Sequence, residues 1–109
     1  MHFPLESIPE NTVLGDLAVA YMSLSKGTDI NAMLKGLPND MCHCPHWGYA
    51  TKGSIKLNYA DGSEETISAG DAFYMPANHT AEILDDFAML EFSPKKEHDE
   101  VMAHIAKNQ

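Results

Sequence analysis

The segment Ser54–Ser63, which reads Ser-Ile-Lys-Leu-Asn-Tyr-Ala-Asp-Gly-Ser, decides the fold class of this chain. Polar and apolar residues alternate strictly as far as Tyr59, and a period of two is typical of a β-strand with one buried face. Asp61-Gly62 follows, a pair that tolerates the positive φ angles of a tight hairpin turn. The segment therefore predicts two antiparallel strands joined by a short turn, the second returning through Glu64–Ile67.

The sequence on either side repeats this arrangement of short strands and turns. We expect strands at 17–24, 72–75, 83–84 and 87–92, with turns at 69–71 and at Asp85-Asp86. Turn signals about every 8 to 12 residues indicate an all-β sandwich or barrel. Residues 29–38 allow either a brief helix capped by Asp29 or a strand. Ser93 as N-cap and Pro94 at the first helical position predict a C-terminal amphipathic helix over 94–107.

Composition limits the partners and the compartment. A chain of 109 residues forms one domain, 1–109, here with an N-terminal arm at 1–14. The net charge of −9 argues against nucleic acid or an anionic membrane surface as a partner. No run of 18 apolar residues and no signal-peptide pattern is visible, so we expect a cytoplasmic protein.

The run Met41–Trp47 holds both cysteines and two of the six histidines of the chain. If it is extended, Cys42, Cys44 and His46 point to one face and His43 to the other. The two thiols then stand about 6.5 to 7 Å apart, too far for a disulfide. Thiolate and imidazole together suit Zn²⁺, with Fe²⁺, Ni²⁺ or Mn²⁺ as alternatives. His79 is the expected fourth ligand. The opposing interpretation treats each of these residues as ordinary buried core.

The glycine and proline spacing of residues 53–79 resembles the cupin superfamily. Gly70, five further residues and Pro76 match the start of that family's second motif, and Gly53 matches the end of its first. The run Cys-x-Cys-Pro-His-Trp-Gly at 42–48 is also similar to a small group of single-domain bacterial cupins. The resemblance implies a jelly-roll β-barrel, an association into a homodimer, and a barrel lumen used for small molecules.

The ligand positions depart from the family's pattern. Counting back from Gly53 places His46 where the motif has glutamate, and Cys42 and Asp40 where it has histidines. Asp40 also fits a turn after Pro38, and we prefer that interpretation. His79 lies three residues after Pro76, whereas the motif histidine lies five after it. The resemblance therefore implies a metal site rebuilt with softer ligands.

Two classes of function remain open at this point. In an enzyme, the metal keeps one open position for water or a small-molecule substrate. In a sensing or structural module, Cys42, Cys44, His46 and His79 all close on the metal. The sequence does not choose between them.

Overall fold

Strand β3 (His46–Tyr59) is the centre of the molecule, because it pairs with three other strands in the computed structural model, which describes residues 1–107. The predicted hairpin is confirmed: β3 pairs antiparallel with β4, from Ser54 opposite Ser68 to Asn58 opposite Glu64. Gly62 has a φ of 89° in the turn, and the Asp61 carboxylate accepts a hydrogen bond from the backbone N–H of Ser63 over 2.8 Å.

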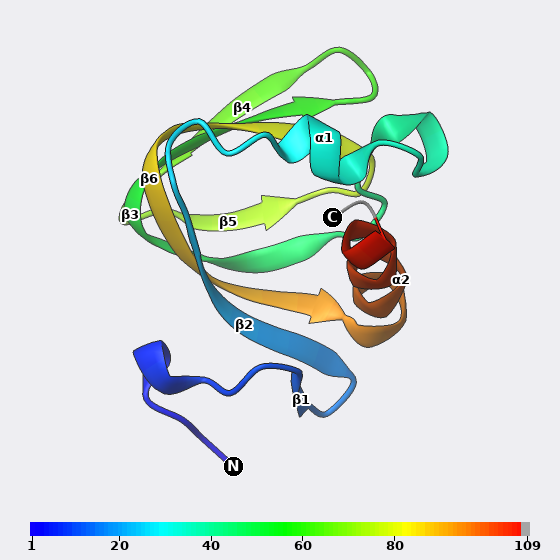
Figure 1. The fold of residues 1–109 in the computed structure, drawn as a ribbon. Coiled ribbons are helices and arrows are strands. Elements are labelled where there is room, and N and C mark those ends of the chain that lie inside the picture. Colours follow the sequence, from blue (N-terminus) through cyan, green and yellow to red (C-terminus); the bar gives the residue numbers. More distant parts are fainter. Residues whose placement is uncertain (108–109) are drawn as a thin grey trace.

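The strands form one antiparallel sheet with the order β1-β2-β6-β3-β4, and β5 pairs with β3 beyond this path. The sheet curls on itself, as Figure 1 shows, and gives the expected all-β, barrel-like architecture with a C-terminal helix. The N-terminal arm contributes its edge strand. The elements are β1 (Thr12–Leu14), β2 (Leu17–Leu24), α1 (Ile30–Leu34), β3, β4 (Glu64–Ser68), β5 (Ala72–Met75), β6 (His79–Pro94) and α2 (Lys95–Lys107).

The predicted turn at Asp85-Asp86 is wrong, because β6 runs through it without a break. The register between β3 and β6 shifts three times between Ala50 and Ile55, so the irregularity lies within a pair of bent strands. Gly53 makes this possible: its φ is 70°, and a Cβ there would lie 2.0 Å from the carbonyl oxygen of Asp86. The two aspartates are exposed at the bend instead of closing a hairpin.

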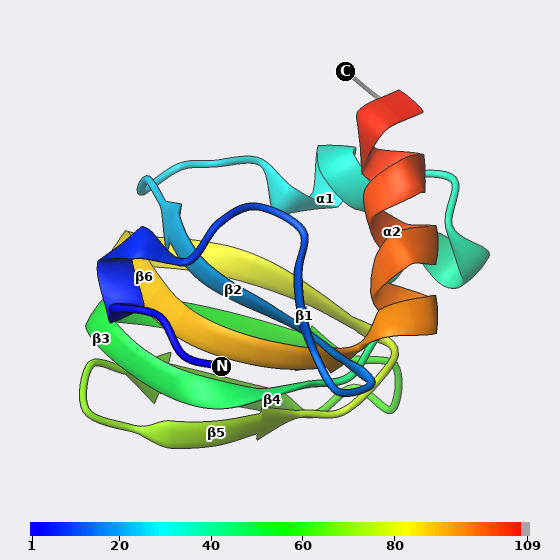
Figure 2. The same ribbon diagram turned by 90° about the horizontal axis from the view of Figure 1, so that it is seen from below.

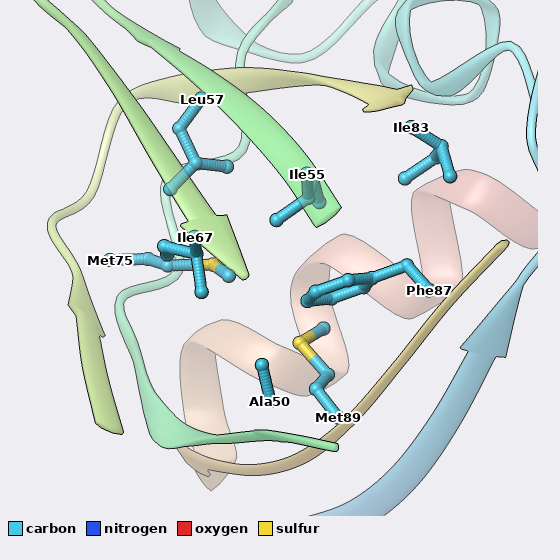
Figure 3. Close-up of a cluster of buried hydrophobic side chains, with 8 residues drawn as sticks. All are labelled: Ala50, Ile55, Leu57, Ile67, Met75, Ile83, Phe87 and Met89. Atoms are coloured by element: carbon cyan, nitrogen blue, oxygen red, sulfur yellow. The ribbon is translucent and has the colours of Figure 1, made fainter. Parts of the chain in front are cut away.

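The main core lies inside the curl of the sheet. The inward positions of the alternating pattern supply it, and the side chains from β3, β4, β5 and β6 converge in Figure 3. Full burial of a Leu or Phe side chain contributes about 1.5 to 3 kcal/mol each, which makes this cluster a principal source of stability. Its buried members are Ala50, Ile55, Leu57, Ile67, Met75, Ile83, Phe87 and Met89.

Both helices lie at the same end of the sheet and contact each other there (Figures 1 and 2). Residues 30–34 take the helical alternative, and the side chain of Asp29 caps α1 by accepting from the N–H of Ala32 over 3.0 Å. Helix α2 begins at Lys95, one residue later than predicted. A second buried cluster joins the helices to the segment before β3: Leu34, Leu37, Cys42, Cys44 and Val101. No helix within residues 1–107 is long and apolar enough to span a membrane.

Candidate metal centre

Three of the four predicted ligands meet at the helical end of the barrel. One ligand atom each from Cys42, His46 and His79 lie within 4.8 Å of one another. The Sγ of Cys42 is 3.7 Å from Nε2 of His46, and the two imidazole rings meet edge to face with centroids 5.4 Å apart. Residues that lie before β3, at its start and after β5 in the sequence thus form one cluster.

Backbone pairing holds Cys42 beside His79. The two residues form an isolated β-bridge, in which the N–H of Cys42 donates to the carbonyl of His79 over 2.9 Å. The N–H of His79 donates back to the carbonyl of Cys42 over 3.2 Å. This bridge anchors the loop before β3 to the first residue of β6, so the thiol and the imidazole are positioned by the barrel.

The extended strand expected through the cysteine motif is not formed. Strand β3 begins only at His46, and residues 43–45 belong to no helix or strand. Cys44 is fully buried, and its thiol donates to the carbonyl of Pro45 over 3.4 Å. Its sulfur is not part of the cluster of three. The role of Cys44 as a fourth ligand therefore stays a prediction.

Each histidine of the cluster has its second ring nitrogen occupied. Nδ1 of His79 lies 2.7 Å from the carbonyl of Pro76, and since a carbonyl only accepts, this nitrogen carries the proton. Nε2 of His79 is then left with its lone pair. Nδ1 of His46 lies 2.7 Å from Oγ of Ser93, while its Nε2 faces Cys42. Metal-binding histidines in proteins almost always have such a partner on the far nitrogen, because it fixes the ring and the tautomer.

Burial keeps all three groups neutral at pH 7. It raises the pKa of the Cys42 thiol from 9.0 to about 11, and it lowers the pKa values of His46 and His79 from 6.5 to about 4. The imidazoles are therefore in the form that binds a metal, whereas the thiol has to lose its proton to solvent when a cation binds.

Two further residues of the site were missed in the sequence. Glu91 is buried with 4% of its surface exposed, and one of its carboxyl oxygens is 3.7 Å from Nδ1 of His46. Burial raises its pKa from 4.5 to about 7. Ser93, predicted to cap the helix, instead points its hydroxyl at His46. The sequence did contain one signal for Glu91, which is its position inside the apolar run Phe-Ala-Met-Leu-Glu-Phe at 87–92.

The spacing of Cys42 and His46 and the chemistry of the three donors suit a zinc-type ion. With bonds of about 2.0 Å to nitrogen and 2.3 Å to sulfur, neighbouring donors of a tetrahedral shell lie roughly 3.3 to 3.8 Å apart. The 3.7 Å between Cys42 and His46 agrees with this spacing. One thiolate and two imidazoles are also a chemically suitable set for such an ion, and three protein ligands leave a fourth position open.

A cavity of about 110 Å³ adjoins the cluster between the inner face of the sheet and the two helices. Cys42, His46, His79 and Glu91 line it together with apolar side chains of β2, β3, β6 and both helices. An ion held by Cys42, His46 and His79 would therefore lie beside an internal space large enough for a small molecule.

Comparisons with known proteins place the fold. By sequence, no protein-family model matches the chain, and no characterised protein matches it. By structure, it is similar to protein NMB1881 from Neisseria meningitidis with a TM-score of 0.56 and 15% identity, over 83% of this chain and 91% of that one. A cupin 2 conserved barrel domain protein from Salinispora arenicola has a TM-score of 0.52 and 18% identity, covering 89% of this chain and 79% of its own.

A third similar structure is a cupin-2 domain-containing protein from Shewanella frigidimarina. Its TM-score is 0.52 at 10% identity, over 76% of this chain and 74% of that one. The similarity at these low identities extends over most of each chain and concerns the arrangement of the strands. The chain has the cupin fold.

Proposed function

We propose that the protein binds one transition-metal ion, with zinc as the first candidate, through Cys42, His46 and His79. A small molecule then binds in the adjoining cavity at the fourth position of the ion. The observation that carries this proposal is the cluster itself, three donor atoms within 4.8 Å of one another at a cavity wall. When bound, such an ion supplies Lewis acidity and lowers the pKa of a coordinated water.

The closed site is the alternative, with Cys44 as fourth ligand and no position for a substrate. The open site is favoured by the contacts of Cys44, whose thiol donates to the carbonyl of Pro45 and lies outside the cluster of three. To close the shell, Cys44 would have to leave this carbonyl and turn within a fully buried position. Packing at native density makes such a change costly.

Metal content tests the proposal and separates the two sites. We expect about one equivalent of metal in the protein purified without chelator, less than a tenth in Cys42→Ala, and a retained equivalent in Cys44→Ala. Loss of the metal from both variants would establish the closed site. A wild-type protein with less than a tenth of an equivalent that also fails to bind added zinc would reject the metal-binding function.

We also propose that the protein is a homodimer. Trp47, Tyr49 and Tyr74 lie on the outer face of β3 and β5, each 42 to 50% exposed, and the rings of Trp47 and Tyr74 stack with centroids 5.0 Å apart. Contiguous apolar surface of this kind marks protein contacts. Light scattering should give twice the chain mass, and Tyr74→Lys should shift the protein toward monomer. A monomeric wild type, unchanged by deleting residues 1–12, would refute the dimer.

The compartment and the partners follow from the same chemistry. Both cysteines are free thiols in the structure, and metal binding by Cys42 needs a reduced sulfur. We therefore propose a reducing compartment, the cytoplasm. The net charge of −9 supports a small-molecule ligand over nucleic acid. Retention of the chain on a nucleic-acid column at 0.15 M salt would contradict the second point.

A further inference from the structure

The cavity beside the metal cluster is apolar over most of its wall. Its lining comes from β2, α1, β3, β5, β6 and α2, and it is made largely of aliphatic and thioether side chains. Methionine is prominent, with five of the seven methionines of the chain, and its flexible thioether adapts to differently shaped apolar ligands. These five are Met22, Met33, Met75, Met89 and Met102.

The polar groups of the wall are few. Besides the cluster and Cys44, they are the carboxyl of Glu91 and the imidazole of His98 on α2. His98 interacts electrostatically with both Glu91 and His46, so it belongs to the polar end of the cavity that holds the cluster. None of the described residues that line the cavity is a lysine, and the chain contains no arginine.

Without a bound ion, this wall disfavours an anionic ligand. A carboxylate or phosphate entering the metal-free cavity would lose its hydration and find no Lys or Arg side chain to pair with. Glu91 offers it no attraction when protonated and repels it when ionised. An uncharged head group avoids both costs and can still approach the cluster through an oxygen or sulfur atom.

The volume limits the size of the ligand. An apolar cavity of about 150 Å³ holds benzene, with its six carbon atoms. The space here is about 110 Å³. A ligand of about four to six non-hydrogen atoms therefore fits without displacing the wall.

We propose that the cavity binds a small uncharged molecule, a short-chain alcohol, thiol or carbonyl compound, with its apolar body among the methionines and its head group toward Cys42, His46 and His79. The orientation of the head group rests on the proposed metal site. The apolar character and the size limit rest on the cavity alone.

The first experiment compares probes of matched size on the metal-free protein. Binding of 1-butanol, 1-butanethiol and butyrate is followed by chemical-shift changes of the cavity methionine methyl groups. We expect the thiol and the alcohol to bind at least tenfold more tightly than butyrate. Butyrate binding as tightly as the neutral probes, or no binding of any of the three, would overturn the inference while leaving metal binding intact.

Two pairs of variants locate the binding. Ala81→Leu adds three carbon atoms to the wall and should abolish probe binding while metal content stays at one equivalent. Ala72→Leu makes the same change at an exposed position of β5 and should have no effect. Met102→Ala, at a half-exposed wall position, should shift the preference from butanol toward hexanol. Unchanged probe binding in Ala81→Leu would place the ligand elsewhere and reject the proposal.

A probe without a head group keeps the two proposals separate. If the protein binds no zinc, the proposed function fails, and benzene binding to the metal-free protein then tests the cavity by itself. A rise in melting temperature with benzene that Ala81→Leu removes would support the apolar site. No response to benzene would reject it.

Discussion

Replacing Ser93 by alanine tests whether the hydrogen bond to His46 positions the candidate metal ligand. The hydroxyl of Ser93 lies 2.7 Å from Nδ1 of His46, and the serine has no exposed surface. Loss of such a partner typically weakens metal binding 10- to 100-fold, or about 1.4 to 2.7 kcal/mol. The carboxyl of Glu91, 3.7 Å from the same nitrogen, can partly replace the hydroxyl, so we expect the lower half of this range.

The same substitution should destabilise the metal-free protein. A buried polar atom left without its partner costs about 1 to 3 kcal/mol, here reduced by the nearby carboxyl of Glu91. Competition with a chromophoric chelator gives the zinc affinity, and urea unfolding gives the stability. Ser23→Ala, at an exposed position of β2, is the matched control and should change neither. Zinc affinity within threefold of wild type, together with unaltered stability, would refute the positioning role of Ser93.

Three further predictions concern the cluster and the core. His79→Ala should lose the metal and lower the melting temperature of the loaded protein, because metal binding contributes to folding. The control is His43→Ala, which removes a ring that contacts Glu100 and should keep the metal. The reverse result would exclude the cluster described here. Raising the pH from 9 to 11 should destabilise the metal-free protein by up to about 1.4 kcal/mol per pH unit for each of the two buried thiols. The cause is that burial raises the pKa of Cys42 from 9.0 to about 11 and that of Cys44 to about 12, so the unfolded chain loses these protons first. Denaturant unfolding across this range checks it, and a flat profile would contradict the burial of the thiols. Leu57→Ala, at 1% exposure, should cost about 2 to 5 kcal/mol of unfolding free energy, whereas Leu17→Ala at 38% exposure should cost under 1; equal losses would contradict the core assignment.

Local patterns predicted the parts of the fold that local chemistry determines. The alternation from Ser54 to Tyr59 and the turn at Asp61-Gly62 correspond to β3, its turn and β4, since each depends on residues close in sequence. The prediction of a turn at Asp85-Asp86 was wrong because it also used local sequence alone. Aspartate pairs are common in turns, and only the approach of Gly53 to Asp86 from another strand shows that they lie at a bend.

Three residues of the candidate cluster were predictable from the sequence, but their surroundings were not. His79 was proposed from its residue type, and the structure brings it to Cys42 and His46. Ser93 was assigned to a helix cap, because a serine before a proline is a frequent helix start. Its contact with His46, 47 residues earlier, has no trace in the neighbouring sequence. Glu91 was missed because its neighbours in the sequence are apolar and do not show that its carboxyl lies near His46.

The position of His79 and Ser93 at opposite ends of β6 has a consequence for folding kinetics. The strand pairs with β3 from His79 to Phe92 and with β2 from Phe87 to Pro94, and this long-range pairing brings both of its ends to His46. Contacts between distant parts of a chain form slowly, because the loop-closure entropy is lost before they contribute any energy. The complete site should therefore appear at the end of refolding, after the β3–β4 hairpin, and an ion present during refolding should stabilise the native state more than it accelerates folding.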